Sequence, residues 1–326
     1  MNKSCFIHRP TPAASVACLS LAMLCALTAP AQELGPAPGV PEGFMLIEGD
    51  ILVRLPKPGT PAPKGVYRET STYFWPGGVV PYEFDANVSA ANRTAAINAM
   101  AEWEAVANVD FRARSGDDNY IHVQDSNVNS SQVGRVGGRQ DVNISSWGSR
   151  FIIAHELGHA LGFWHEQSRS DRDTYVRINW GNIEEGKAHN FNTHDEAKHY
   201  GPYDFDSVMH YDGKSFSTNG LDTITVLPPN DVLWQAGIGQ RDHFSTWDQR
   251  IMSYLYPESN WRFCDTTRTG AGSGSFLDPF KYFTDAKASV PNYGHLFLVK
   301  PGNYAAVGVH SKPMTLRAPL SGAVLK

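Results

Sequence analysis

The run His155-Glu156-Leu157-Gly158-His159, near the middle of the 326-residue chain, has the residue types of a metal site. On a helix, residues four apart point from the same face, so His155 and His159 can share one zinc ion. Glu156 lies on the same turn, where its carboxylate can accept a proton from a water that the metal activates. Taken alone, this short pattern fits equally well two surface histidines beside a solvated glutamate.

The residues that follow favour the metal site. A helix that continued to His165 would place that residue roughly 15 Å along the axis from His155, beyond the reach of one ion. Gly162 can adopt the left-handed conformation that ends a helix and turns the chain back. His165 then completes a set of three histidines that leaves one coordination position open, as catalytic zinc sites do.

The elements that must position this site lie before it in the sequence. Residues 79–84 have the apolar and β-branched pattern of a strand. A helix follows, opened by Asn87 or Ser89 as the N-cap. Four apolar residues fall at helical spacing on one expected buried stripe: Ala96, Met100, Trp103 and Ala107. Further strand-like runs occupy residues 109–112 and 120–123. Helix and sheet together indicate an α+β fold.

Two blocks of sequence resemble a known family. The run HELGHALGFWHEQSRSDRD, from His155 to Asp173, is similar to the metzincin zinc signature HExxHxxGxxH and to its astacin branch in particular. The block Ser207-Val208-Met209-His210-Tyr211 is similar to the astacin Met-turn, SxMHY. Other astacin-like stretches occur in the expected order, at residues 120–123, 133–135, 190–191, 203–206 and 238–241. The resemblance spans residues 75 to 257. It implies a zinc endopeptidase with a mixed, mostly parallel twisted sheet, an active-site helix and a Met-turn.

The resemblance also implies roles for individual residues. His155, His159 and His165 would bind one zinc ion per chain, and Glu156 would be the general base. Met209 would form the apolar floor under the histidines. Tyr211 would approach the zinc and then donate a hydrogen bond to the developing oxyanion. Two further roles concern Glu166, which would contact the new N-terminus of the mature enzyme, and residues 133–138. This last segment is either the edge strand to which a substrate peptide adds or an ordinary surface loop.

A second resemblance concerns a short apolar run, residues 44–53, within the segment 32–68 that is otherwise rich in Pro and Gly. The run contains Ile47-Glu48-Gly49-Asp50-Ile51, which is similar to the astacin propeptide motif FxGDI, with Ile47 in place of the aromatic residue. In that family the aspartate occupies the open zinc position. Asp50 would therefore keep the enzyme latent, and the alternative is a plain Gly-Asp turn. The expected cleavage point is Arg68.

The first 31 residues have the pattern of an export signal. Lys3 and Arg9 form a positive start, residues 13–29 form an almost uncharged apolar run, and Ala31 ends a small-residue cleavage site. A buried N-terminal helix is the alternative. Export would change the net charge from −5 to −7, because the removed segment carries only Lys3 and Arg9 as charged residues. An acidic chain of this kind gives no reason to expect nucleic acid as a partner, and no stable membrane insertion is expected.

Four cysteines are present, at Cys5, Cys18, Cys25 and Cys264. Three of them would leave with the signal, so an intramolecular disulfide is excluded in the exported chain. Lipid attachment at Cys18 or Cys25 is an alternative to cleavage. The remaining thiol, Cys264, is a candidate for pairing between two chains.

The expected layout has four parts: a signal peptide (1–31), a propeptide (32–68), a protease domain (69–258) and a β-rich segment (259–326). Strand-like runs at residues 295–300, 304–309 and 314–318 make that last segment a small β appendage or a truncated binding module. Residues 276–326 look similar to the opening coils of secreted right-handed β-helix proteins. The predicted function is a secreted or periplasmic zinc endopeptidase that acts on proteins or peptides. A secreted adhesin or carbohydrate-binding protein is the rival, and action on a single target is a third possibility.

Overall fold

The structure, a computed structural model, describes residues 40–41, 43–54, 73–194, 198–306 and 310–326. The expected signal peptide, Arg68 and much of the expected propeptide lie outside these residues. Within the described part, every helix is too short or too polar to cross a bilayer.

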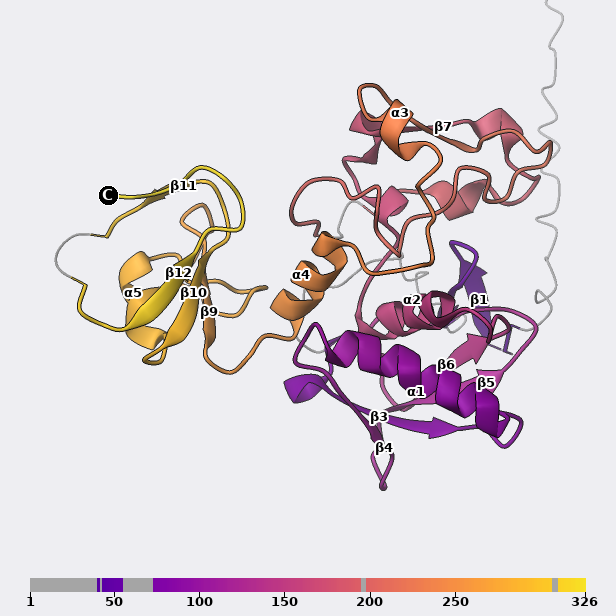
Figure 1. The fold of residues 1–326 in the computed structure, drawn as a ribbon, viewed down its shortest axis with the longest axis horizontal. Helices are drawn as coiled ribbons and strands as arrows, with labels where there is room; N and C mark the ends of the chain where they lie inside the picture. Colours follow the sequence, from indigo (N-terminus) through magenta and orange to yellow (C-terminus); the bar gives the residue numbers. More distant parts are fainter. Residues whose placement is uncertain (1–39, 42, 55–72, 195–197, 307–309) are drawn as a thin grey trace, which may run out of the picture. The chain divides into compact units, whose positions relative to one another are not determined.

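A four-stranded parallel sheet forms the base of the expected protease domain (Figure 1). Its strands are β3 (Val79–Phe84), β4 (Asp110–Ala113), β5 (Tyr120–Asp125) and β6 (Arg139–Ile144), in the order β4-β3-β5-β6. Beside the edge strand β6, an isolated antiparallel bridge joins Ser130 to Asn143. The predicted strands are confirmed, as is the mixed and mostly parallel sheet.

Helix α1 (Ala90–Glu104) begins at Ser89, whose hydroxyl accepts a hydrogen bond from the Asn92 amide. This selects Ser89 over Asn87 as the cap. The first three residues of the predicted stripe are buried on α1, but Ala107 is only partly buried and lies beyond the end of the helix. That part of the prediction was wrong because helical spacing does not show where a helix ends.

Helix α2 (Arg150–Leu161) carries the two histidines of the motif and packs side by side with α1 over the sheet (Figure 1). Trp103 of α1 joins the two helices. It is fully buried, its indole nitrogen donates to the carbonyl of Ala154 at 2.8 Å, and its ring stacks on Phe244 with centroids 3.8 Å apart. The position of α2 therefore depends on this side chain.

We expect Trp103→Ala to lower the free energy of unfolding by about 3–5 kcal/mol, because it removes a large buried ring and the indole hydrogen bond to the Ala154 carbonyl. Urea unfolding of the variant measures this loss. The exposed Ile97 on the same helix provides the control, since Ile97→Ala removes little buried surface. Equal losses in the two variants would contradict the assigned role.

The second half of the expected protease domain is built mostly from short elements. These are η3 (Glu166–Ser168), η4 (Arg172–Thr174), β7 (Val176–Ile178), η5 (Trp180–Asn182), η6 (Ala188–Phe191), β8 (Ile224–Val226) and α3 (Asp231–Trp234). Another short element, η2 (Pro76–Gly78), lies directly before β3. Strands β7 and β8 pair antiparallel. Helix α4 (Thr246–Leu255) begins with a capping box of Ser245 and Asp248. Asp248 also accepts hydrogen bonds from the Ser207 hydroxyl and the Val208 amide at 2.7 and 2.8 Å, so the start of α4 holds the expected Met-turn in place.

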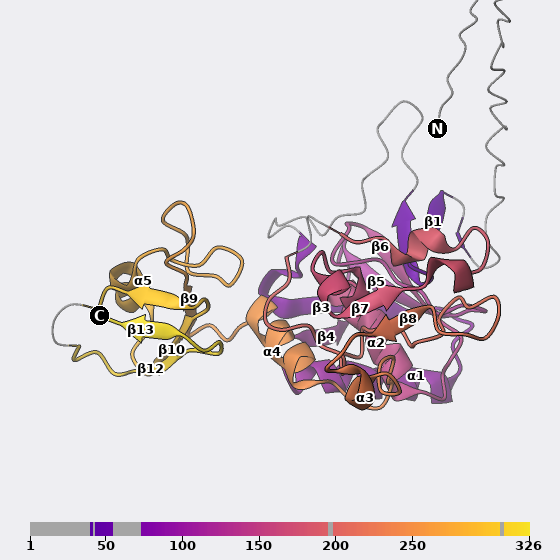
Figure 2. The same ribbon diagram turned by 90° about the horizontal axis from the view of Figure 1, so that it is seen from above.

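The C-terminal segment consists of parallel strands around α5 (Phe283–Ser289) (Figure 2). Its strands are β9 (Trp261–Cys264), β10 (Gly294–Leu298), β11 (Gly302–Tyr304), β12 (Met314–Arg317) and β13 (Ala323–Leu325). The pairs β10–β12 and β11–β13 are parallel with offsets of about 20 residues along the chain, which is a coiled arrangement like the one expected for residues 276–326. The strand expected at 304–309 instead begins at Gly302 and ends at Tyr304.

Cys264 lies inside the apolar cluster of this segment with no exposed surface, and burial raises the pKa of its thiol to about 12. A buried thiol that stays protonated is poorly placed to react. The structure thus argues against the expected pairing of two chains through Cys264.

Candidate active site

Helix α2 ends as the sequence predicts. Gly162 has a φ of 117°, and its amide donates to the carbonyls of Gly158 and His159. This left-handed residue turns the chain back, and His165 returns to the face of α2 that carries His155 and His159.

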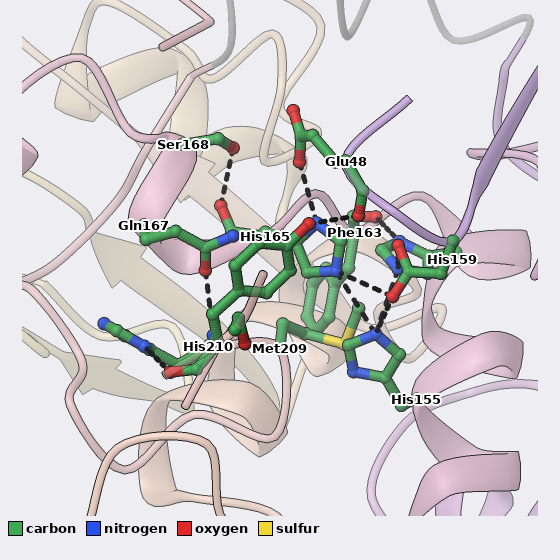
Figure 3. A network of polar contacts seen from close by, with 12 residues as sticks. Glu48, His155, His159, Phe163, His165, Gln167, Ser168, Met209 and His210 are labelled. Atoms are coloured by element: carbon green, nitrogen blue, oxygen red, sulfur yellow. Dashed lines mark hydrogen bonds and ion pairs between the residues drawn. The ribbon is translucent and has the colours of Figure 1, made fainter. Parts of the chain in front are cut away.

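Three imidazole nitrogens and one carboxylate converge at this point (Figure 3). His155 Nε2 lies 3.2 Å from His159 Nε2 and 3.3 Å from His165 Nε2. Asp50 Oδ2 lies 3.2 Å from the Nε2 atoms of both His155 and His165. Four tetrahedral ligands at zinc distances of 2.0–2.1 Å would be about 3.3 Å apart. The spacing of these four side chains therefore fits one zinc ion.

The other ring nitrogen of each histidine has its own acceptor. His155 Nδ1 donates to the carbonyl of Val208 at 2.8 Å, and His159 Nδ1 donates to that of Phe163 at 2.7 Å. His165 Nδ1 lies 2.7 Å from a carboxylate oxygen of Glu48. Such bonds orient the rings and keep Nε2 free as a ligand.

Burial sets the charge of the first two histidines. It lowers the pKa of His155 to about 4 and holds the pKa of His159 well below its usual value. Burial acts in the same direction on His165, but the carboxylates of Asp50 and Glu48 outweigh it and raise the pKa of His165 to about 9. Two of the three rings are therefore neutral, which is the form that binds metal.

Asp50 comes from a hairpin formed by β1 (Phe44–Ile47) and β2 (Ile51–Arg54). At its turn, Glu48 and Gly49 have φ values of 48° and 76°. The hairpin is attached beside the sheet, because the Ser131 amide donates to the Asp50 carbonyl at 2.8 Å and the Leu52 amide donates to the Ser131 carbonyl at 2.7 Å. Backbone bonds at Asp50 and Leu52 thus help to hold the Asp50 side chain over the three histidines.

Glu156 and Tyr211 flank the metal position. Glu156 is buried, and its Oε2 atom has no hydrogen-bond partner among the described residues. Burial, followed by the charge of Asp50, raises the pKa of Glu156 well above its usual value. The Tyr211 hydroxyl donates to the backbone carbonyl of Glu48. Both groups that are expected to act in catalysis therefore lie beside the turn that carries Asp50.

Met209 lies beneath the histidine-bearing helix. Its sulfur is so close to Gly158 of α2 that an added Cβ there would lie 3.1 Å from it. Met209 is buried, as is expected for an apolar floor.

Glu166 is placed beside the metal site, but its partners are internal. Its Oε1 atom accepts from Arg169 and from the Asp204 amide, both at 2.8 Å. Burial, opposed by Arg169, raises the pKa of Glu166 to about 7.

The edge strand expected at residues 133–138 is absent. These residues form a loop, in which the Gly134 amide donates to the His159 carbonyl, and the edge of the four-stranded sheet is β6. The surface-loop alternative was right, since a segment whose amides bond to α2 and to Tyr73 is not free to pair as a strand.

Three residues of the site were not found from the sequence. Glu48 lies in the motif that was attributed to Asp50 alone, and its position two residues from Asp50 was the available signal. His194 binds the second oxygen of Glu48. Arg241 is placed by its bond to the His210 carbonyl at 3.0 Å and contributes positive charge near Glu156 and Asp50. Nothing local in the sequence marks His194 or this role of Arg241.

Comparisons with known proteins agree with this geometry. Residues 67–257 match the model of the Astacin peptidase family. High choriolytic enzyme 1 of Oryzias latipes is 37% identical over 221 residues, which cover 65% of this chain and 78% of that protein. Zinc metalloproteinase nas-13 of Caenorhabditis elegans is 40% identical over 59% of this chain and 43% of its own length. Meprin A subunit beta of Rattus norvegicus is 36% identical over 66% of this chain and 30% of its own length.

A solved structure of High choriolytic enzyme 1, a hatching enzyme zinc-protease from Oryzias latipes, superposes with a TM-score of 0.53. It is 39% identical and covers 57% of this chain and 96% of that one. The expected metzincin-type α+β fold is thereby confirmed. Because the family match covers more than half of the sequence and includes the three histidines and Glu156, the chain belongs to the astacin family and is a zinc metalloendopeptidase.

Proposed function

We propose that the chain is made as a latent endopeptidase, in which His155, His159 and His165 bind the zinc ion and Asp50 blocks the position that a substrate needs. The observation that carries this proposal is the spacing of these four side chains, which matches one tetrahedral ion. Removal of the pro-segment, residues 32–68, would then open the site. The export pattern of residues 1–31 supports secretion.

In the open enzyme, bound zinc would polarise the scissile carbonyl and make a water molecule more acidic. Glu156 accepts a proton from the attacking water and returns it to the amine nitrogen as the C–N bond breaks. Burial, the first cause of the raised pKa of Glu156, favours the protonated carboxyl that forms during this exchange. The Tyr211 hydroxyl, released from the Glu48 carbonyl, is free to donate to the oxyanion.

Substrates of this site are proteins or peptides. Arg241 is the cation beside the metal position, and it acts electrostatically on Asp50 and Glu156. When Asp50 leaves with the pro-segment, one of the negative charges near Arg241 is lost. An acidic side chain next to the scissile bond of a substrate would restore it.

A casein assay with and without a chelator tests the proposed function. After removal of the pro-segment, the enzyme should degrade casein, and the chelator should abolish this activity because the three histidines alone activate no water. Added Zn²⁺ should restore it. Chelator-resistant cleavage would contradict a zinc mechanism.

Replacing Tyr211 tests the oxyanion role. We expect Tyr211→Phe to lower kcat about 10²–10³-fold with little change in KM, since a donor that acts on the transition state is removed. Steady-state kinetics of the processed enzyme measure both constants. Tyr203→Phe serves as the control, because its hydroxyl bonds to His210 Nε2 instead. A change confined to KM would assign Tyr211 to substrate binding.

A further inference from the structure

The three histidines differ in what holds their outer ring nitrogens. His155 and His159 donate to backbone carbonyls of Val208 and Phe163, which belong to the part of the chain that remains after processing. The partner of His165 is the Glu48 side chain, which leaves with the pro-segment (Figure 3). Maturation would therefore remove the hydrogen-bond partner of the outer ring nitrogen of one histidine only, His165.

The Glu48 carboxylate is buried, and both of its oxygens have hydrogen-bond partners. The side chain is almost fully buried, and the two carboxylate oxygens are engaged by two imidazoles, Oε2 by His165 and Oε1 by His194. His194 in turn packs against the ring of Trp164, with centroids 4.2 Å apart. A buried carboxylate is costly unless hydrogen bonds satisfy it, and here both oxygens are satisfied.

The backbone of Glu48 supports the same interpretation. Its φ of 48° lies in the left-handed region, which is uncommon for a residue other than Gly. This conformation lets the side chain reach His165 while the carbonyl of the same residue accepts the Tyr211 hydroxyl. The residue thus contacts the site through both its side chain and its backbone.

We propose that Glu48 is a positioning residue of the latent form: its carboxylate orients His165 and makes the uncleaved chain hold zinc more firmly than the processed enzyme does. The inference rests on the proposed roles of the three histidines and Asp50. A carboxylate on the outer nitrogen of a ligating histidine fixes its tautomer and raises its basicity, and loss of such a partner typically lowers metal affinity 10–100-fold.

The test measures zinc release from uncleaved chains. All proteins carry Glu156→Gln, so that they cannot process themselves, and zinc transfer to a chromogenic chelator is followed. We expect Glu48→Ala to release zinc at least about 10-fold faster than the parent. Glu48→Gln, which keeps an acceptor oxygen for His165, should fall between the two. Met45→Gln, an exposed position on β1, should release zinc at the parent rate.

The processed forms provide an internal control. After trypsin removes the pro-segment at the expected junction, Arg68, the parent and both Glu48 variants have the same sequence and should release zinc at one rate, faster than the uncleaved parent. With Co²⁺ in place of zinc, the visible spectrum of the uncleaved Glu48→Ala chain should differ from that of the uncleaved parent. A general folding defect would lower the unfolding midpoint of the metal-free chain, and the proposal requires that this midpoint stay unchanged.

Two outcomes overturn the inference. One is a parent-like release rate and cobalt spectrum in uncleaved Glu48→Ala, and the other is faster release that a lowered metal-free midpoint explains. An Asp50→Ala chain measured in parallel separates this failure from failure of the proposed function. If Asp50→Ala alters zinc release and Glu48→Ala does not, only the role of Glu48 is lost. If neither does, the proposed contact of the pro-segment with the metal is lost as well.

Discussion

Glu156→Gln is expected to abolish measurable peptide hydrolysis while the enzyme keeps one zinc ion per chain. Gln has nearly the same shape as Glu but cannot accept a proton from water, and general acid–base catalysis of this kind contributes about 10²–10⁴-fold to the rate. Glu156 is buried beside the ligands with one oxygen unpartnered among the described residues, so the amide fits the same space. Cleavage of a fluorogenic peptide by the processed enzyme measures the loss of hydrolysis rate, and metal analysis measures the zinc content.

The matched control is Glu102→Gln on α1, where the partly exposed carboxylate pairs with Arg150 at 2.7 Å. It should retain parent activity. If Glu156→Gln kept more than about a hundredth of the parent kcat, Glu156 would not be the base, because the lower limit of the expected effect is 10²-fold.

Asp50→Ala is expected to convert the latent chain into an active one without cleavage. The side chain occupies a position of the tetrahedron that a substrate carbonyl and water must share, and Ala offers no ligand there. We expect the lag before activity in a progress curve to shorten or disappear. The rate at time zero, measured before any processed band is visible on a gel, is the decisive quantity.

How much activity Asp50→Ala gains before cleavage depends on the rest of the hairpin. The Glu48 side chain still contacts His165 in Asp50→Ala, so part of the inhibition should persist, and the initial rate of Glu48→Ala/Asp50→Ala should exceed that of the single variant. Asp125→Ala, an exposed change at the end of β5, should leave the lag as it is. An unchanged lag in Asp50→Ala would refute the aspartate switch.

The sequence predicted those helices and strands that are determined by residues close together in the chain. Helical spacing placed His155 and His159 on one face, and Gly162 predicted the end of α2, because a left-handed residue is the common way to stop a helix. Three strands of the parallel sheet, β3, β4 and β5, were found from their apolar runs, within two residues at each end, but β6 was not predicted.

What the sequence missed depends on contacts between distant residues. Glu48 and His165 are 117 residues apart in the chain, and no periodic pattern connects them. Residues 133–138 have the composition of an exposed strand or a loop, and only their bonds to Tyr73 and His159 decide the matter. The burial of Cys264 likewise follows from how β9 and β10 pack around α5.

The hairpin that carries Glu48 and Asp50 belongs to the same polypeptide as the site it covers. If this turn inhibits the enzyme as proposed, it does so in the intact chain at an effective concentration of about millimolar or higher, whatever the protein concentration. A single cut in the connection converts it into a separate peptide whose binding obeys ordinary mass action. With the proposed secretion, dilution would then favour its loss, so activation would be nearly irreversible in a large volume and partly reversible in a confined one.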